Sequence, residues 1–190
     1  MEKTGIKLGI IFSKLGLSPN KWTLLTLIPA LLSAYFLITE QFLLSALFLI
    51  VATFIDVIDG AVARVTGRVT KLGAYLDTIM DRYVEGIIIL GLLFLQLPDM
   101  LLPANFWIGF LVFGSLMTTY VKAAAKEKEL TEKELKGGIV ERAERMIILF
   151  IGIVLAYFDK TFLVYAIVLI AVLSNISALQ RIYYAIKLKN

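Results

Sequence analysis

The sequence predicts an all-α integral membrane protein, in which a bundle of six transmembrane helices follows an interfacial amphipathic helix. Two observations predict this class. The 190 residues are 59% hydrophobic and 18% charged and their mean hydropathy is +0.87, whereas a soluble domain is roughly half apolar and a quarter charged. Apolar runs near the length of about 20 residues that crosses a bilayer follow one another with short connections. We expect a single membrane domain over residues 1–190, because no large soluble domain fits beside these runs.

The first element is expected over residues 1–17 and should lie along the membrane surface. Lys3, Lys7 and Lys14 share one face of a helix there, whereas Ile6, Ile10 and Leu17 fall elsewhere. Such a helix lies on anionic headgroups with its apolar face buried. A signal peptide is the competing interpretation, but the apolar stretch is short and no small-residue cleavage pattern follows it.

Six apolar runs then form the expected bundle of residues 18–190. All of them should be helices, since open strand edges cannot sit in lipid. Ser18 is placed to cap the first helix, and Pro19 suits its first turn. The runs cover residues 22–39, 42–63, 72–97, 105–120, 139–158 and 161–186.

The basic residues predict the orientation of this bundle. The connections around Glu40, Asp99 and Asp159 are short and nearly free of Lys and Arg, whereas every basic residue except Lys160 lies on or near the opposite side. By the positive-inside rule that side is cytoplasmic, so we expect both termini in the cytoplasm. The excess of positive charge is explained in this way, and no nucleic-acid partner is expected.

The composition also limits the chemistry. The chain contains neither Cys nor His, which excludes disulfides, thiolate or imidazole metal sites and acid–base catalysis by His. Any reaction must therefore use carboxylates, Lys, Arg, hydroxyl groups or a metal bound through oxygen.

Four carboxylates interrupt the second and third apolar runs. Asp56 and Asp59 share one helix face, and so do Asp77 and Asp81. In an antiparallel hairpin, Asp56 would lie opposite Asp81 and Asp59 opposite Asp77. Ionised carboxylates this close repel one another strongly in a low-dielectric interior, and two divalent cations would neutralise them. Oxygen ligands without His or Cys select Mg²⁺, Mn²⁺ or Ca²⁺.

Small residues and an arginine accompany these carboxylates. Gly60 and Ala63 keep one helix face bare enough for a ligand to approach the backbone, and Gly73 does the same at the next helix. Arg64 can bind phosphate oxygens with two parallel hydrogen bonds. Together they predict a pocket for a phosphate-bearing ligand. The ordinary alternative is that the small residues serve helix packing and that nearby arginines satisfy the buried carboxylates.

Taken in order, these residues form the pattern Asp56-x2-Asp59-Gly60-x2-Ala63-Arg64-x8-Gly73-x3-Asp77-x3-Asp81. At every defined position it resembles the signature of the CDP-alcohol phosphotransferase family. The resemblance extends over the whole chain, because that family has six transmembrane helices preceded by a juxtamembrane amphipathic helix. It implies transfer of a substituted phosphoryl group from a CDP-linked donor to an alcohol, with release of CMP on the cytoplasmic side. It also implies a homodimer.

The resemblance further implies a role for each residue. Two divalent cations, Mg²⁺ or Mn²⁺, would be held by the carboxylates of Asp56, Asp59, Asp77 and Asp81. Asp81 would also be the catalytic general base that takes the proton of the acceptor hydroxyl. The CDP-linked donor would be bound by residues of the pattern and of the first helix: Gly60, Ala63, Arg64, Gly73, Pro19, Asn20 and Thr23.

The acceptor is indicated by residues 141–145, Glu-Arg-Ala-Glu-Arg, which resemble a Glu-Arg-x-(Glu/Asp)-Arg stretch of family members that use an inositol phosphate. Arg142 and Arg145 can bind one phosphate between them, with Lys136 as a third cation. The ordinary alternative is that Glu141 pairs with Arg145 along the helix. We therefore expect inositol phosphate as the acceptor, with glycerol phosphate or another alcohol as the alternative.

The donor lipid stays open, because the chains of CDP-diacylglycerol and CDP-archaeol would lie against the same apolar surface. A composition without His and Cys but rich in Ile, Leu, Lys and Glu hints at a thermophilic protein, which favours archaeol. A soluble CDP-inositol donor is a further alternative. From another class of protein, the rival is a small divalent-cation transporter. It would explain the carboxylates, but not Gly60, Ala63 and Arg64 at their spacing.

Overall fold

The computed structural model of the protein describes residues 3–131 and 137–189. Within these residues the regular elements are α-helices, apart from an isolated bridge between Met100 and Leu102. The expectation of an all-α protein is therefore confirmed. The chain divides into two compact units, Met1–Phe94 and Leu95–Asn190, and each has its own set of packed helices.

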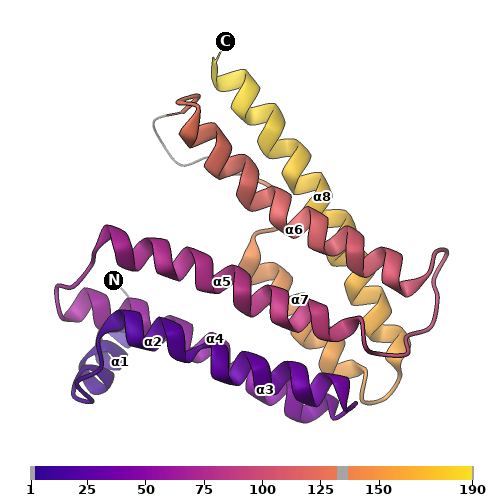
Figure 1. Cartoon of the computed structure of the whole chain (residues 1–190), viewed down its shortest axis with the longest axis horizontal. Coiled ribbons are helices and arrows are strands. Elements are labelled where there is room, and N and C mark those ends of the chain that lie inside the picture. Colours follow the sequence, from indigo (N-terminus) through magenta and orange to yellow (C-terminus); the bar gives the residue numbers. More distant parts are fainter. Residues whose placement is uncertain (1–2, 132–136, 190) are drawn as a thin grey trace. The chain divides into compact units, whose positions relative to one another are not determined.

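Among its described residues, unit 1 contains five helices, of which α2 and α3 form the centre of the packing. Helices α2 and α3 pack against both α4 and α5, and α1 packs against α4. The core contains fully buried side chains such as Leu37, Leu49, Ile58, Ile88 and Leu92. The helices, seen in Figure 1, are α1 (Lys3–Ser13), α2 (Pro19–Leu25), α3 (Leu27–Ile38), α4 (Phe42–Val65) and α5 (Lys71–Leu92).

The first predicted span is a broken helix rather than a continuous one. Ser18 stands at the N-cap and Pro19 in the first turn of α2, as expected, although the Ser18 side chain makes no capping hydrogen bond. The break falls at Thr26, whose hydroxyl donates to the carbonyl of Thr23 at 2.6 Å. Pro29 has no N–H to donate to the preceding turn, which leaves that turn without one of its helical hydrogen bonds and accounts for the break.

Helix α1 forms where the amphipathic helix was expected, and it packs closely on α4. A Cβ atom on Gly9 would lie only 2.6 Å from the carbonyl oxygen of Ala61, so the two backbones are in near contact. Phe12 meets Trp22 edge to face, with 5.6 Å between the ring centroids. Ile11 is 59% exposed. The position of α1 along a membrane surface stays a prediction.

Unit 2 contains α6 (Ala104–Glu127), α7 (Arg142–Leu155) and α8 (Lys160–Lys189). Helix α8 packs against both α6 and α7. A polar contact joins α6 and α8, because the Asn175 amide donates to the carbonyl of Phe110 at 2.9 Å. The predicted run over residues 139–158 becomes helical only at Arg142, since Gly137 and Gly138 have positive φ angles and Glu141 is extended.

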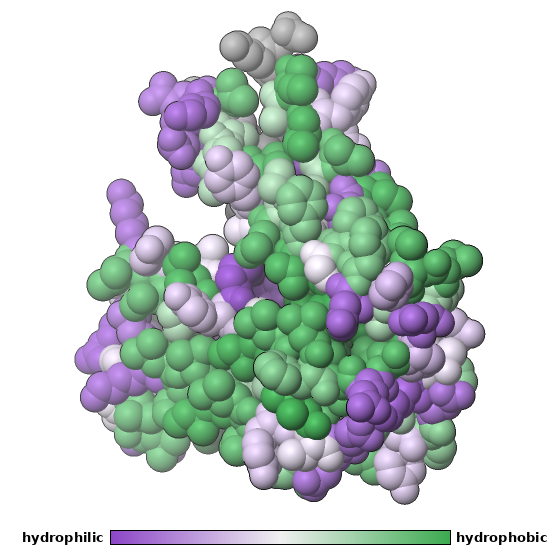
Figure 2. Space-filling model, turned by 45° about the vertical axis from the view of Figure 1, so that its right-hand side comes forward, coloured by the Kyte–Doolittle hydropathy of each residue, from purple (hydrophilic) through white to green (hydrophobic). Residues whose placement is uncertain are grey.

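Four stretches among the described residues are long and apolar enough to cross a membrane: Pro19–Ile38, Phe42–Val65, Ala104–Glu127 and Lys160–Lys187. Helix α5 contains the charged residues Asp77, Asp81, Arg82 and Glu85, and α7 is only 14 residues long. Hydrophobic side chains cover much of the surface in Figure 2, as expected for a protein that faces lipid. The protein is therefore an integral membrane protein, and the count of six spans stays a prediction.

Candidate active site

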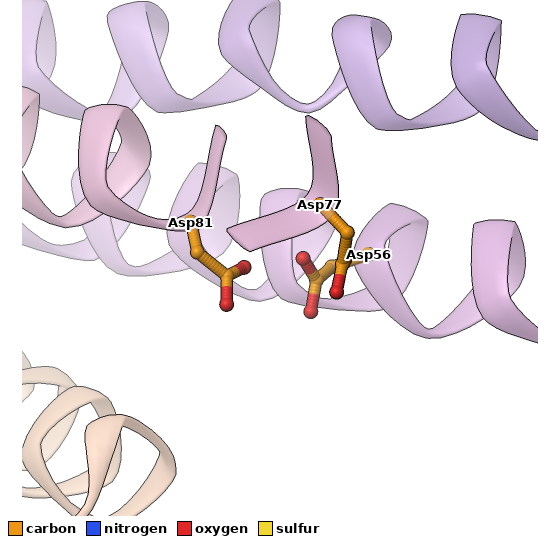
Figure 3. Close-up of side chains that lie close together, drawn as sticks. All are labelled: Asp56, Asp77 and Asp81. Atoms are coloured by element: carbon orange, nitrogen blue, oxygen red, sulfur yellow. The ribbon is translucent and has the colours of Figure 1, made fainter. Parts of the chain in front are cut away.

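Three carboxylates from two helices converge in unit 1. Asp56 of α4 and Asp77 and Asp81 of α5 each place one oxygen within 4.8 Å of the oxygens of the other two. All three side chains are half-buried, and Figure 3 shows them extending to the same side of α5. We refer to Asp56, Asp77 and Asp81 as the carboxylate triad. The predicted approach of Asp56 to Asp81 is part of this arrangement.

Asp59 belongs to the predicted set but lies outside the carboxylate triad. It is only 5% exposed, and it lines the same pocket as Thr23. Its Oδ2 atom is buried and finds no hydrogen-bond partner among the described residues. A buried carboxylate oxygen without a partner is costly in a protein interior, and a cation would satisfy it.

The donor atoms of this region fit a hard divalent cation. Three converging carboxylates and the orphaned oxygen of Asp59 offer oxygen ligands alone, which suit Mg²⁺ or Mn²⁺ better than zinc. Part of the negative charge is offset by Arg82, whose Nη1 lies 3.7 Å from Asp81 Oδ2. Arg82 therefore satisfies part of the carboxylate charge, as the alternative of nearby arginines expects. Arg64 and Arg68, in contrast, line the neighbouring pocket.

A pocket of about 520 Å³ opens beside the carboxylates. Residues of α2, α4 and α5 line it, and all seven residues predicted to bind the donor are among them: Pro19, Asn20, Thr23, Gly60, Ala63, Arg64 and Gly73. Asp56, Asp59 and Asp77 also line the pocket. The structure thus brings together in one cavity residues that span three helices.

Both glycines of the pattern mark places where polar groups approach the backbone. A Cβ atom on Gly60 would lie 3.2 Å from Arg64 Nη1, so the guanidinium lies close to the bare face of α4. The backbone N–H of Gly73 donates to the hydroxyl of Thr70, the N-cap of α5, at 3.0 Å. Since Thr70 and Gly73 line the pocket, the positive end of α5 adds to the attraction for an anionic ligand.

Sequence reasoning missed five of the lining residues: Val57, Arg68, Val69, Thr70 and Ala74. Thr70 carried a readable signal, because a Thr ahead of a helical run is a common N-cap. Arg68 follows Gly67, which has a φ angle of 66°, and its N–H donates to the carbonyl of Ala63 at 2.9 Å. This turn sends a second arginine to the pocket beside Arg64.

The predicted acceptor residues lie in unit 2. Arg142 and Arg145 occupy the first turn of α7, where Arg145 is 2% exposed and Arg142 is half-buried. Lys136 lies outside the described residues. The carboxylate of Glu141 contacts Arg181 at 3.3 Å and Lys122 at 3.6 Å, two cations that the sequence had indicated only as markers of orientation.

Comparisons with known proteins show the family of this chain. The family model described as CDP-alcohol phosphatidyltransferase matches residues 17–177. The archaetidylinositol phosphate synthase of Pyrococcus horikoshii is 33% identical over 183 residues, which cover 95% of this chain and 90% of that protein.

Solved structures of the phosphatidylinositol phosphate synthase of Mycobacterium tuberculosis share the fold. The crystal structure with CDP-DAG bound has a TM-score of 0.84 and 26% identity, covering 95% of this chain and 92% of that one. The complex with manganese and citrate has a TM-score of 0.85 and 27% identity, covering 95% and 88%.

Proposed function

The chain belongs to the CDP-alcohol phosphatidyltransferase family, and we propose on this basis that it transfers a phosphatidyl-type group from a CDP-linked lipid to an inositol phosphate. The observation that carries the proposal is the pocket of about 520 Å³, which is lined by all seven predicted donor residues and by three of the four predicted metal ligands. The relatives named archaetidylinositol and phosphatidylinositol phosphate synthase support the choice of acceptor.

The CDP part of the donor occupies this pocket. Arg64 and Arg68 supply positive charge for the pyrophosphate, and a guanidinium can hold two phosphate oxygens at once. The bare faces at Gly60 and Gly73 let the ligand approach the backbone. The lipid is diacylglycerol or archaeol, since both would lie against the apolar outer surface of the helices.

Asp56, Asp59, Asp77 and Asp81 hold two divalent cations, Mg²⁺ or Mn²⁺. When bound, these cations neutralise charge on the pyrophosphate and on the leaving CMP. A transporter would need the same carboxylates, but it has no use for a neighbouring pocket with two arginines.

Asp81 acts as the general base. It lies one turn beyond Asp77 on α5, further from the helix start at which Thr70 and Gly73 line the pocket. From there it takes the proton of the acceptor hydroxyl. The freed oxygen forms a bond to the phosphorus that carries the lipid, and the bond from that phosphorus to the CMP oxygen breaks.

Arg142 and Arg145, with Lys136, bind the phosphate of the acceptor. Two guanidinium groups in the first turn of α7 oppose the positive end of the helix dipole. Sequence features that cost stability in this way are expected at functional sites. An anionic group bound there would offset the repulsion.

The remaining expectations on architecture are part of the proposal. The whole chain acts as one membrane domain of six spans, with α5 and α7 as the two spans that length and composition alone do not identify. Helix α1 lies along the cytoplasmic surface, where its exposed Ile10 and Ile11 reach the lipid. Both termini and the active site face the cytoplasm, and the enzyme is a homodimer.

Release of CMP tests the function directly. The purified protein is incubated with Mg²⁺ or Mn²⁺, with CDP-diacylglycerol or CDP-archaeol, and with inositol phosphate, glycerol phosphate, serine or free inositol. We expect CMP release with inositol phosphate and metal, and none when a chelator is added. Release with another acceptor and not with inositol phosphate would overturn the acceptor assignment. Divalent-cation flux in proteoliposomes, without CMP release from any mixture, would favour the transporter.

A further inference from the structure

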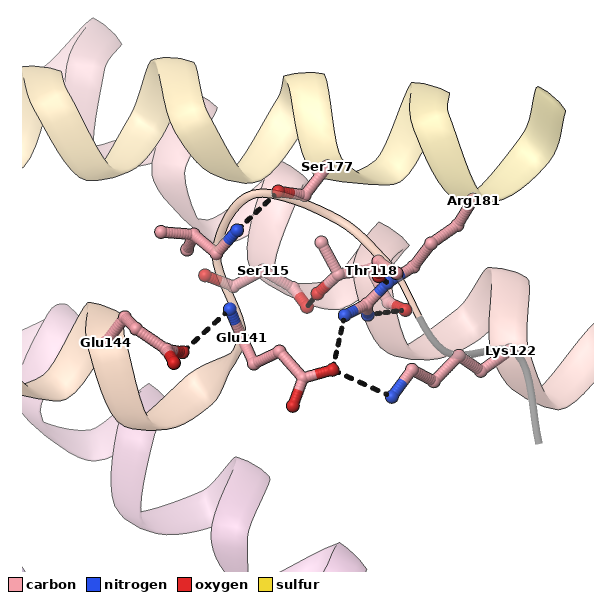
Figure 4. A network of polar contacts seen from close by, with 9 residues as sticks. Ser115, Thr118, Lys122, Glu141, Glu144, Ser177 and Arg181 are labelled. Atoms are coloured by element: carbon pink, nitrogen blue, oxygen red, sulfur yellow. Dashed lines mark hydrogen bonds and ion pairs between the residues drawn. The ribbon is translucent and has the colours of Figure 1, made fainter. Parts of the chain in front are cut away.

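The start of α7 is held by contacts from both other helices of unit 2. Two arginines in the first turn disfavour this helix end, and the chain reaches it through Gly137 and Gly138, whose φ angles are 134° and 110°. A capping box of Glu141 and Glu144 stabilises the helix start from within, and contacts from other helices fix its position. Figure 4 shows that such contacts come from α6 and α8.

Glu141 joins the three helices through a single carboxylate oxygen. Its Oε1 accepts a hydrogen bond from Arg181 Nη2 at 3.3 Å and lies 3.6 Å from Lys122 Nζ. Its backbone N–H donates to Glu144 Oε2 at 2.9 Å, and its carbonyl accepts the N–H of Arg145 at 3.2 Å. The residue directly before Arg142 is therefore tied to α6, to α8 and to the first turn of α7.

Arg181 is a rigid anchor for this contact. It is 4% exposed, and it also donates hydrogen bonds to the carbonyl oxygens of Gly137 and Thr118, both at 2.7 Å. A planar guanidinium held on three sides has little freedom to move. The approach to α7 is fixed at a further point, since the N–H of Val140 donates to the hydroxyl of Ser177 at 3.0 Å.

We infer that Glu141 is a positioning residue for acceptor binding, and this inference rests on the acceptor proposed above. Its carboxylate, held by Arg181 and Lys122, fixes the backbone from which Arg142 and Arg145 project. Both guanidinium groups then meet the acceptor phosphate in one arrangement. Glu141 itself touches neither substrate. Small displacements of a substrate-binding group are costly, because binding and orientation depend on its exact placement.

Glu141→Gln tests this role, because it keeps the size of the side chain and removes its charge. We expect the KM for inositol phosphate to rise about tenfold, the KM for the CDP-linked donor to change less than about twofold, and kcat to fall little. Glu127→Gln is the matched control, since the Glu127 carboxylate is 72% exposed and pairs with the neighbouring Lys128. That variant should keep both KM values.

A conservative variant separates positioning from stability. Glu141→Asp keeps the charge on a shorter side chain, and we expect a KM for inositol phosphate between those of the wild type and Glu141→Gln. The thermal midpoint of each variant is measured in the same detergent. Equal acceptor KM values in wild type and both variants would overturn the inference, as would a parallel rise in donor and acceptor KM. If the wild type releases no CMP with inositol phosphate, the proposed acceptor is wrong, and the inference that rests on it is wrong too. The wild-type assay alone distinguishes this outcome from a failure of the inference about Glu141.

Discussion

Gly73 on α5 faces Asn20 on α2 so closely that a Cβ atom on Gly73 would lie 3.3 Å from Asn20 Oδ1. The same atom would lie 3.1 Å from the hydroxyl of Thr70, the N-cap of α5. The starts of two helices therefore meet at the wall of the pocket, and a glycine makes this approach possible. All three residues line that pocket.

Replacing Gly73 with Ala should weaken donor binding without unfolding the protein. The added methyl group pushes Asn20 and Thr70 apart, which costs about 1 kcal/mol or more and raises the donor KM about fivefold. Ala also favours a helix over Gly by about 1 kcal/mol, so the thermal midpoint should not fall. Gly86→Ala on the same helix is the control, because a Cβ atom there meets nothing within 4 Å. An unchanged donor KM in Gly73→Ala would contradict the assignment of the pocket.

Asp81→Asn should abolish turnover and leave donor binding intact. A general base contributes at least about 100-fold to the rate, whereas Asp56, Asp59 and Asp77 still line the pocket. CMP release measures turnover, and calorimetric titration with the CDP-linked donor measures binding. Loss of donor binding in this variant would identify Asp81 as mainly a metal ligand.

Asp56→Asn should lower the affinity for Mn²⁺. Asp56 is the residue through which α4 contributes to the carboxylate triad, so its neutralisation removes a charged ligand. We expect a loss of affinity of at least about 100-fold, the upper end of the effect of changes outside the ligand shell, measured by electron paramagnetic resonance of free Mn²⁺. Asp99→Asn serves as control, since Asp99 accepts the N–H of Ala104 in another part of the chain. Equal affinities in the two variants would argue against the metal site.

The two glycines of α1 should respond differently to the same substitution. At Gly9 a Cβ atom would lie 2.6 Å from the carbonyl oxygen of Ala61, whereas at Gly5 it would meet nothing within 4 Å. Gly9→Ala forces the helices apart at a cost of about 1–3 kcal/mol and should lower the thermal midpoint in detergent. Gly5→Ala gains up to about 1 kcal/mol of helix propensity and should raise it slightly. Equal midpoints would mean that α1 does not pack on α4 in solution.

Asp159 should make stability sensitive to acid. Its carboxylate accepts the N–H of Thr161 at 2.8 Å, and this hydrogen bond lowers the pKa of Asp159 below the usual 3.8. The contribution to stability is therefore complete above pH 3.8 and is lost as the pH falls through the lower pKa of the folded state. Thermal midpoints of wild type and Asp159→Ala should differ at pH 7 and converge in acid. A difference that does not depend on pH would exclude the carboxylate as its cause.

Sequence reasoning worked best where the information is local and periodic. The placement of Asp77 and Asp81 on one face of α5 follows from a spacing of four residues, and Gly60 and Gly73 stood out because each leaves a helix face bare close to the carboxylates. The structure of unit 2 was less accessible. Arg181 donates a hydrogen bond to the carbonyl of Thr118, which lies 63 residues earlier in the sequence. No local sequence pattern predicts such a contact.

The break at Thr26 was also missed, although its physical cause was visible. A hydropathy window averages over the run and does not register the backbone effect of Pro29, whereas the missing N–H of proline interrupts the helix. The apolar runs at α5 and α7 were predicted, although α5 carries several charges and α7 is only 14 residues long. Hydropathy therefore located the helices of this chain but not their interruptions.

The pocket has a consequence for how the protein is made. Every residue that lines it lies between Pro19 and Asp77, within the first of the two compact units. Contacts between segments close in sequence form early, and domains fold from the N-terminus as synthesis proceeds. The donor pocket can thus be complete before the ribosome has finished the second unit. A nascent chain released after unit 1 would already hold the whole pocket that we propose for the donor nucleotide.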